Sequence, residues 1–150
     1  MSVLVGSWAL ISSSGNAGTQ DYAKRFKTYE CSNKTLRGTY GGQMQGARPA
    51  PGGGLEQLIG VVIRTYDGAG NFTQVDNIKG SVAGIVPDRP GSGTYSVSAD
   101  CSFTTQFQPG PGVLIEETGN IVDYGNEVQS ITVTPQPLMV TGSAKRIGFR

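Results

Sequence analysis

The 150-residue chain contains no histidine, and this absence excludes several kinds of site. Histidine is the commonest general base near neutral pH and a frequent metal ligand. A Ser-His-Asp triad and a histidine-ligated zinc site are therefore excluded. We expect the protein to use neither a metal nor a cofactor.

Charged residues are also scarce, at 15% of the chain against roughly 25% in ordinary globular proteins. Twelve basic and eleven acidic residues leave a formal net charge of +1, so the chain lacks the basic surface that nucleic acids or anionic membranes require. Serine, threonine, asparagine and glutamine supply the polarity instead. Together with 23 glycines, they indicate one domain of many short strands and tight turns.

Cysteine is limited to Cys31 and Cys101, too few for a four-cysteine zinc site and too far apart for a CxxC redox motif. A disulfide between them would close a loop of about 70 residues. Two separate buried thiols are the alternative.

The longest apolar run near the N-terminus, residues 3–11, is interrupted by Trp8 and has no basic residue before it. It is neither a good signal peptide nor long enough to span a bilayer, and its alternation predicts a strand. The following "TQDYAKRFKTYE" predicts a short helix, since Tyr22, Phe26 and Tyr29 recur at i, i+4 and i+7.

From Leu36 onward the chain alternates strands with turns. "LEQLIGVVIRTY" predicts a long strand and "DGAGN" a hairpin turn, whereas "ARPAPGGG" and "VPDRPGSG" predict loops. Closing such a sheet removes its two unpaired edges. We therefore predict an all-β fold, a single antiparallel up-and-down β-barrel of about eight to nine strands with one short N-terminal helix. Residues 1–30 form an N-terminal extension and residues 31–150 the barrel core, and a β-sandwich is the alternative.

The opening "LVGSW" places Gly6 two residues before Trp8, and it resembles the Gly-x-Trp start of the first strand in lipocalin-like barrels of the calycin type. In that family the Trp plugs the closed end of the barrel. The later "LRGTY" repeats the order Leu, Gly, hydroxyl residue, aromatic. We expect it to start the barrel proper, with Tyr40 filling one barrel end.

Residues 31–147 resemble a group of uncharacterised, usually exported, bacterial β-barrel proteins. The resemblance rests on "CSNKTLRGTYGGQMQG", "GVVIRTYDGAGNFT", "GTYSVSADCSFT" and "VDYGNEVQSI". The group has two cysteines at the positions of Cys31 and Cys101. The resemblance therefore implies a disulfide and an exported location, periplasmic or extracellular, with a cytoplasmic location as the alternative.

Three charged residues lie in otherwise apolar strands and are candidates for chemistry. Arg64, in "GVVIRTY", would bind an anionic or enolate oxygen if it faces the lumen. Glu116 and Glu117 are adjacent, so at most one enters the lumen, where burial would raise its pKa and suit it to general acid or base catalysis. The alternative is that one is solvated and the other pairs with Arg64 or Arg146.

Other polar residues of the predicted strands are candidates for contacts with a ligand. Their tyrosine, amide and carboxyl groups would give a cavity hydrogen-bonding capacity, although strand tyrosines also pack in cores and glutamines also face solvent. These candidates are Tyr40, Gln43, Tyr66, Gln74, Asp76, Tyr95 and Gln129.

Three hypotheses follow for function. The first is a barrel that binds a small hydrophobic or amphipathic molecule in its lumen. The second is a cofactor-independent isomerase or cyclase that folds a flexible polyketide- or lipid-like substrate, with Arg64 and a glutamate as polarising groups. The third is an exported assembly protein, a homo-oligomer whose N-terminal strand adds to a neighbour's sheet edge.

Overall fold

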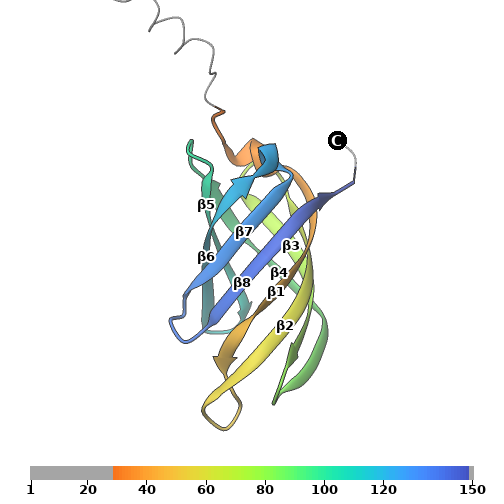
Figure 1. The fold of residues 1–150 in the computed structure, drawn as a ribbon, viewed down its shortest axis with the longest axis vertical. Helices are drawn as coiled ribbons and strands as arrows, with labels where there is room; N and C mark the ends of the chain where they lie inside the picture. Colours follow the sequence, from red (N-terminus) through yellow and green to blue (C-terminus); the bar gives the residue numbers. More distant parts are fainter. Residues whose placement is uncertain (1–28, 149–150) are drawn as a thin grey trace, which may run out of the picture.

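The computed structural model describes residues 29–148, which form a closed antiparallel β-barrel of eight strands (Figure 1). Each strand pairs with its neighbours in sequence, and the first strand pairs with the last. The predicted up-and-down barrel is therefore confirmed. The strands are β1 (Gly38–Pro49), β2 (Leu55–Tyr66), β3 (Asn71–Gly80), β4 (Gly84–Val97), β5 (Ser102–Gly110), β6 (Val113–Val122), β7 (Glu127–Thr134) and β8 (Met139–Ile147).

The period-two burial pattern of β2 shows how the sequence sets the barrel's inside and outside. Even-numbered residues from Glu56 to Tyr66 point into the lumen, while odd-numbered residues such as Ile59 and Ile63 face outward. Successive side chains of a strand point to opposite faces, so the pairing of β2 with β1 determines which of its polar side chains face the lumen. Arg64 is two residues from the buried Tyr66, so its side chain also faces the lumen.

One end of the barrel is closed by two short 3₁₀ helices, η1 (Asn33–Leu36) and η2 (Asp123–Gly125) (Figure 1). The predicted disulfide is present there and joins Cys31 to Cys101, with their Cα atoms 4.9 Å apart. Tyr40 is fully buried at this end and donates a hydrogen bond to the Gly125 carbonyl at 2.5 Å. "LRGTY" therefore opens the barrel proper, as expected, and its aromatic side chain fills the barrel end.

Arg146, from β8, fastens this closed end. Its Nη2 atom donates to the carbonyls of Thr35 and Gly125 at 2.9 and 2.8 Å, and its guanidinium lies over the Tyr40 ring. A single cation thus joins η1, η2 and β8. The opposite end carries the β1–β2, β3–β4, β5–β6 and β7–β8 hairpins.

The prediction of a loop over "VPDRPGSG" is wrong, because these residues belong to β4. The ladder between β3 and β4 shifts register between Asp76 and Ile78, and Asp88 adopts a φ of 48°. A bulge of this kind lets a strand accommodate residues that break a regular ladder. It also turns Arg89 toward the carboxylate of Asp76.

The predicted N-terminal strand over residues 3–11 lies outside the described residues, as does the predicted helix except for its last two residues. Tyr29 and Glu30 are not helical. The expected count of about nine strands becomes eight within residues 29–148.

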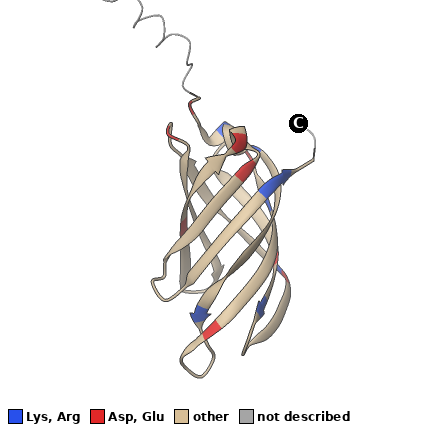
Figure 2. Ribbon diagram, in the orientation of Figure 1, with Lys and Arg blue, Asp and Glu red and all other residues tan. Residues whose placement is uncertain are grey.

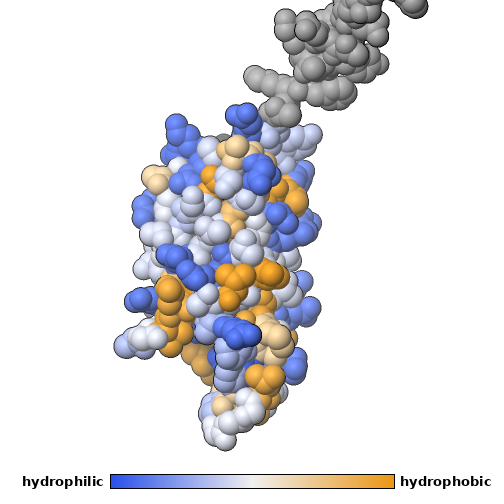
Figure 3. Space-filling view, turned by 90° about the vertical axis from the view of Figure 1, so that its left-hand side faces the viewer, coloured by the Kyte–Doolittle hydropathy of each residue, from blue (hydrophilic) through white to orange (hydrophobic). Residues whose placement is uncertain are grey.

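Figure 2 shows that most charged residues of the barrel lie near its two ends. Figure 3 shows apolar side chains on the outer face, chiefly in the half that carries the β1–β2 hairpin. Exposed apolar residues of the outer face include Ile59, Val61, Ile131 and Met139. Among the described residues, no helix is long and apolar enough to cross a membrane.

Candidate functional site

The half of the lumen next to η1 and η2 is packed with aromatic side chains. Tyr66 is their centre, because its ring lies 5.5 Å from the Tyr40 ring and 4.9 Å from the Tyr95 ring, both edge-on. Gly119 makes room for this packing, since a Cβ there would lie 2.7 Å from the Phe103 ring. The closed half is therefore a core rather than a binding site.

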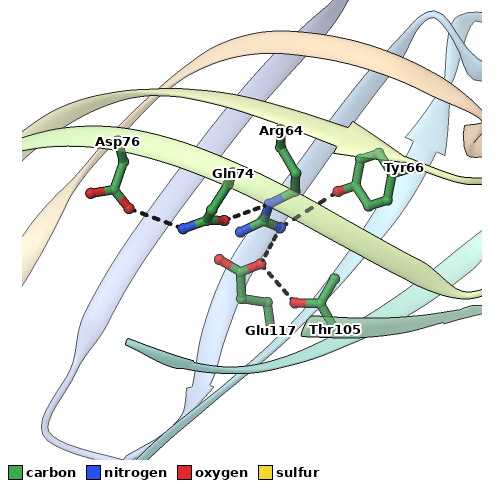
Figure 4. Close-up of polar contacts among 6 residues, drawn as sticks. All are labelled: Arg64, Tyr66, Gln74, Asp76, Thr105 and Glu117. Atoms are coloured by element: carbon green, nitrogen blue, oxygen red, sulfur yellow. Dashed lines mark hydrogen bonds and ion pairs between the residues drawn. The ribbon is translucent and has the colours of Figure 1, made fainter. Parts of the chain in front are cut away.

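A buried ion pair crosses the middle of the lumen (Figure 4). Arg64 Nη1 donates to Glu117 Oε2 at 2.7 Å, and the side chains are only 11% and 15% exposed. Arg64 comes from β2 and Glu117 from β6, strands separated by three others in either direction around the barrel. The pair therefore bridges opposite walls.

Neighbouring polar side chains hold each member of this pair in place. Arg64 Nε donates to Gln74 Oε1 at 2.8 Å, and Gln74 Nε2 donates to Asp76 Oδ2 at 2.9 Å. Thr105 donates its hydroxyl to Glu117 Oε2 at 2.8 Å. Figure 4 shows these residues converging from several strands onto one polar layer.

Two further arginine–carboxylate pairs lie toward the hairpin end. Arg89 donates to both carboxylate oxygens of Asp76, at 2.8 and 3.1 Å. Arg48 Nε donates to Glu56 Oε1 at 2.7 Å across the β1–β2 hairpin. Each of the three arginines thus has a carboxylate partner, as buried charges require.

The electrostatics of the central pair keep both groups ionised. Burial alone would raise the pKa of Glu117, but the charge and hydrogen bond of Arg64, with the Thr105 hydroxyl, hold that pKa below its ordinary value. Burial acts to lower the pKa of Arg64, yet the Glu117 carboxylate and the Tyr66 hydroxyl raise it. Burial raises the pKa of Tyr66, so its phenol is neutral. The prediction of a raised carboxyl pKa is wrong for Glu117, because this glutamate pairs with Arg64, which was the alternative.

The hairpin half of the lumen contains a cavity of about 450 Å³. Its walls combine apolar side chains, including Leu58, Ile115 and Val140, with the Arg64–Glu117 pair. The volume lies within the roughly 300–1,000 Å³ range of small-molecule sites, which are mostly apolar with a few placed polar groups. A void of only about 50 Å³ lies among residues that include Tyr40, Tyr66 and the same ion pair.

The structure brings several of the predicted site residues together in the lumen, although their roles stay predictions. The central polar layer and its aromatic neighbour contain five of them, and the aromatic core of the closed end contains two more. The first group is Arg64, Tyr66, Gln74, Asp76 and Glu117, and the second is Tyr40 and Tyr95.

Three predicted residues lie on the outer face instead. Gln43 and Gln129 are exposed, on strands whose neighbouring residues face inward. Glu116 bonds to Gln106 and Thr134 on the outside of the barrel. Of the two adjacent glutamates only Glu117 enters the lumen, as the alternation of a strand requires.

Sequence reasoning missed four polar residues of the lumen. Arg89 was hidden in a segment whose two prolines indicated a loop, and Thr105 is one of many strand threonines. Arg48 and Glu56 did carry a signal, because they are directly opposite across a glycine-rich hairpin and have opposite charges.

Neither the known protein families nor the curated proteins give a relative from which a function could be transferred. No model of a protein family matches the chain, and no curated protein is similar to it. The conclusions on function therefore rest on the geometry of the lumen.

Proposed function

We propose that this protein binds a small hydrophobic or amphipathic molecule in the lumen of a lipocalin-like barrel. The observation that carries the proposal is the cavity of about 450 Å³, which has apolar walls and a buried ion pair at its inner end. Apolar walls favour the body of such a ligand through burial, at roughly 25 cal/mol per Å². The ion pair offers hydrogen-bonding contacts to a polar group of the ligand at the inner end of the cavity.

The disulfide is consistent with an oxidising, exported location for this binding protein. The closed eight-stranded barrel is likewise consistent with lipocalin-like architecture. Both agree with the resemblance to exported bacterial proteins and support the proposal without depending on a particular ligand.

Nile red, an uncharged dye that emits more strongly in apolar surroundings, tests the proposal. We expect saturable binding to the wild type and at least ten-fold weaker binding to Val140→Trp, which places an indole in the cavity. Met139→Trp is the matched control, because Met139 is 60% exposed on the outer face.

Loss of the signal in Met139→Trp, or equal binding by all three proteins, would show that the dye binds outside the lumen. If Val140→Trp does not fold, Leu138→Trp repeats the test, because Leu138 also lines the cavity.

A cofactor-independent isomerase or cyclase is the second candidate, favoured by one observation. Arg64 is a permanently charged donor beside an ionised carboxylate inside the cavity. It would polarise a substrate oxygen, while Glu117 would accept a proton. Retained turnover in both Arg64→Met and Glu117→Gln would remove this candidate.

The assembly hypothesis needs a free strand edge on a neighbour. Within residues 29–148 the strand order is closed, but β4 pairs with β5 only from Gly93 to Val97, which leaves residues 84–92 with a partner on one side only. The β4 edge at residues 84–92 is therefore the acceptor available within this part of the barrel, and addition of the N-terminal strand to it in a second copy stays a prediction.

A further inference from the structure

The charges around the cavity cancel. Arg48, Arg64 and Arg89 each form an ion pair, with Glu56, Glu117 and Asp76 respectively. A ligand with a net charge would bring an ion with no partner of its own among charges that already neutralise one another, and it would lose hydration without compensation. An anion would also face the Glu117 and Asp76 carboxylates. The lumen therefore disfavours charged ligands.

The central ion pair nevertheless leaves one donor and one acceptor unused. Arg64 binds through Nε and Nη1, and Glu117 accepts both of its hydrogen bonds at Oε2. Within the described residues, Arg64 Nη2 and Glu117 Oε1 have no hydrogen-bond partner. A single hydrogen bond thus joins Arg64 to Glu117, whereas an arginine–carboxylate pair can form two parallel ones.

Figure 4 shows where these two atoms lie. The nitrogen of Arg64 without a dashed line and the oxygen of Glu117 without one are on the same side of the pair, toward Asp76 and away from Tyr66. Asp76 lines the 450 Å³ cavity, whereas Tyr66 lines the small void toward the closed end. An unused donor and an unused acceptor of one ion pair therefore both lie at the inner end of the cavity, whose wall includes Arg64 and Glu117.

We propose that the ligand is an uncharged molecule with an apolar body and a neighbouring oxygen acceptor and hydrogen donor, such as a primary carboxamide or a hydroxy ketone. Its oxygen accepts from Arg64 Nη2 and its N–H or O–H donates to Glu117 Oε1. Its apolar body lies along Leu58, Ile115 and Val140. This inference rests on the proposed lumen-binding function and narrows it to one ligand class.

Three probes of nearly identical shape separate the alternatives: octanamide, 2-nonanone and octanoate. Each has a seven-carbon tail on a carbonyl carbon, and only the third group on that carbon differs. Octanamide supplies acceptor and donor, 2-nonanone supplies the acceptor alone, and octanoate is an anion at pH 7.5. We expect calorimetry to find octanamide tightest, 2-nonanone weaker, and octanoate at least ten-fold weaker than octanamide.

Glu117→Gln provides a second, opposite expectation. It removes the carboxylate charge and leaves Arg64 without its partner, so octanoate should now bind at least ten-fold better relative to octanamide than it does in the wild type. Glu116→Gln is the matched control, because the adjacent residue lies on the outer face, and its probe preference should equal that of the wild type. If Glu117→Gln does not fold, the order of the probes on the wild type decides.

The outcomes separate this inference from the function on which it rests. Equal binding of the probes, or octanoate tightest to the wild type, overturns the neutral ligand class while lumen binding stands. Nile red binding that Val140→Trp abolishes, with no binding of octanamide, has the same meaning. Failure of both the dye and all three probes to bind overturns both proposals.

Discussion

Arg64→Met tests whether the central ion pair has the structural role that its geometry indicates. The substitution keeps most of the side-chain volume and lets a thioether contact the Phe72 ring, over which the guanidinium now lies at 4.5 Å. It leaves Glu117, whose side chain is only 15% exposed, without its cation. Breaking a buried pair costs roughly 3–5 kcal/mol, because the remaining charge is uncompensated. Since the cavity gives this pair some contact with solvent, we expect about 3 kcal/mol.

Urea denaturation at pH 7.5 measures this loss directly, and a thermal melt should show a fall of roughly 6–12 °C for a domain of this size. The double variant Arg64→Met/Glu117→Gln should recover most of the loss, because neither member of the pair is then left as an uncompensated buried charge. Glu116→Gln, on the outer face, should stay within about 0.5 kcal/mol of the wild type.

The deficit of Arg64→Met should also depend on pH. In the wild type the pKa of Glu117 lies below its ordinary value, so the carboxylate's contribution to stability is present above that ordinary value and is lost as the pH falls. Without Arg64, burial raises the carboxyl pKa, and protonation then relieves the buried charge. The gap between the two proteins should therefore shrink as the pH falls through about 4.5. A gap below about 1 kcal/mol at pH 7.5, or one that is constant with pH, would refute this reasoning.

Three further predictions concern the two ends of the barrel. The pKa of Glu56 is lowered to about 2, chiefly by hydrogen bonds from the backbone N–H groups of the β3–β4 turn, with Arg48 contributing. Protonation of Glu56 should therefore destabilise the wild type as the pH falls from 5 to 2. Urea denaturation should show that Glu56→Gln loses less stability than the wild type over this range. Replacing Cys31 and Cys101 by alanine opens a loop of 70 residues and should cost about 4 kcal/mol, and an unchanged unfolding midpoint would contradict this. Tyr40→Phe removes the bond to the Gly125 carbonyl, which still accepts from an arginine, so we expect a loss of only about 1 kcal/mol in the same assay.

The barrel could be predicted because its determinants are local. Alternation of side chains, hairpin turns and the scarcity of helical patterns all appear within short windows. β2 is an example, since Glu56, Arg64 and Tyr66 share one parity and one face. The same rule showed that Glu116 and Glu117 could not both enter the lumen.

The composition of the site could be predicted only in part, because it depends on pairing across the lumen. Nothing local in the sequence relates Arg64 to Glu117, which are 53 positions apart and meet only when the barrel closes. The alternation of strand side chains could have excluded Gln43 from the lumen, because it lies an odd number of residues from the inward-facing Tyr40. Arg89 could not be found, because its strand contains a bulge and two prolines that indicate a loop.

The central claim is that the cavity beside the Arg64–Glu117 pair binds an amphipathic molecule. A crystal structure of the protein purified from its native host, at a resolution that distinguishes a ligand from water, tests it most directly. We predict continuous density in the cavity, with polar atoms against Arg64 Nη2 and Glu117 Oε1 and the remainder along the apolar wall. A cavity that contains only separate water molecules, or that side chains fill, would contradict the account.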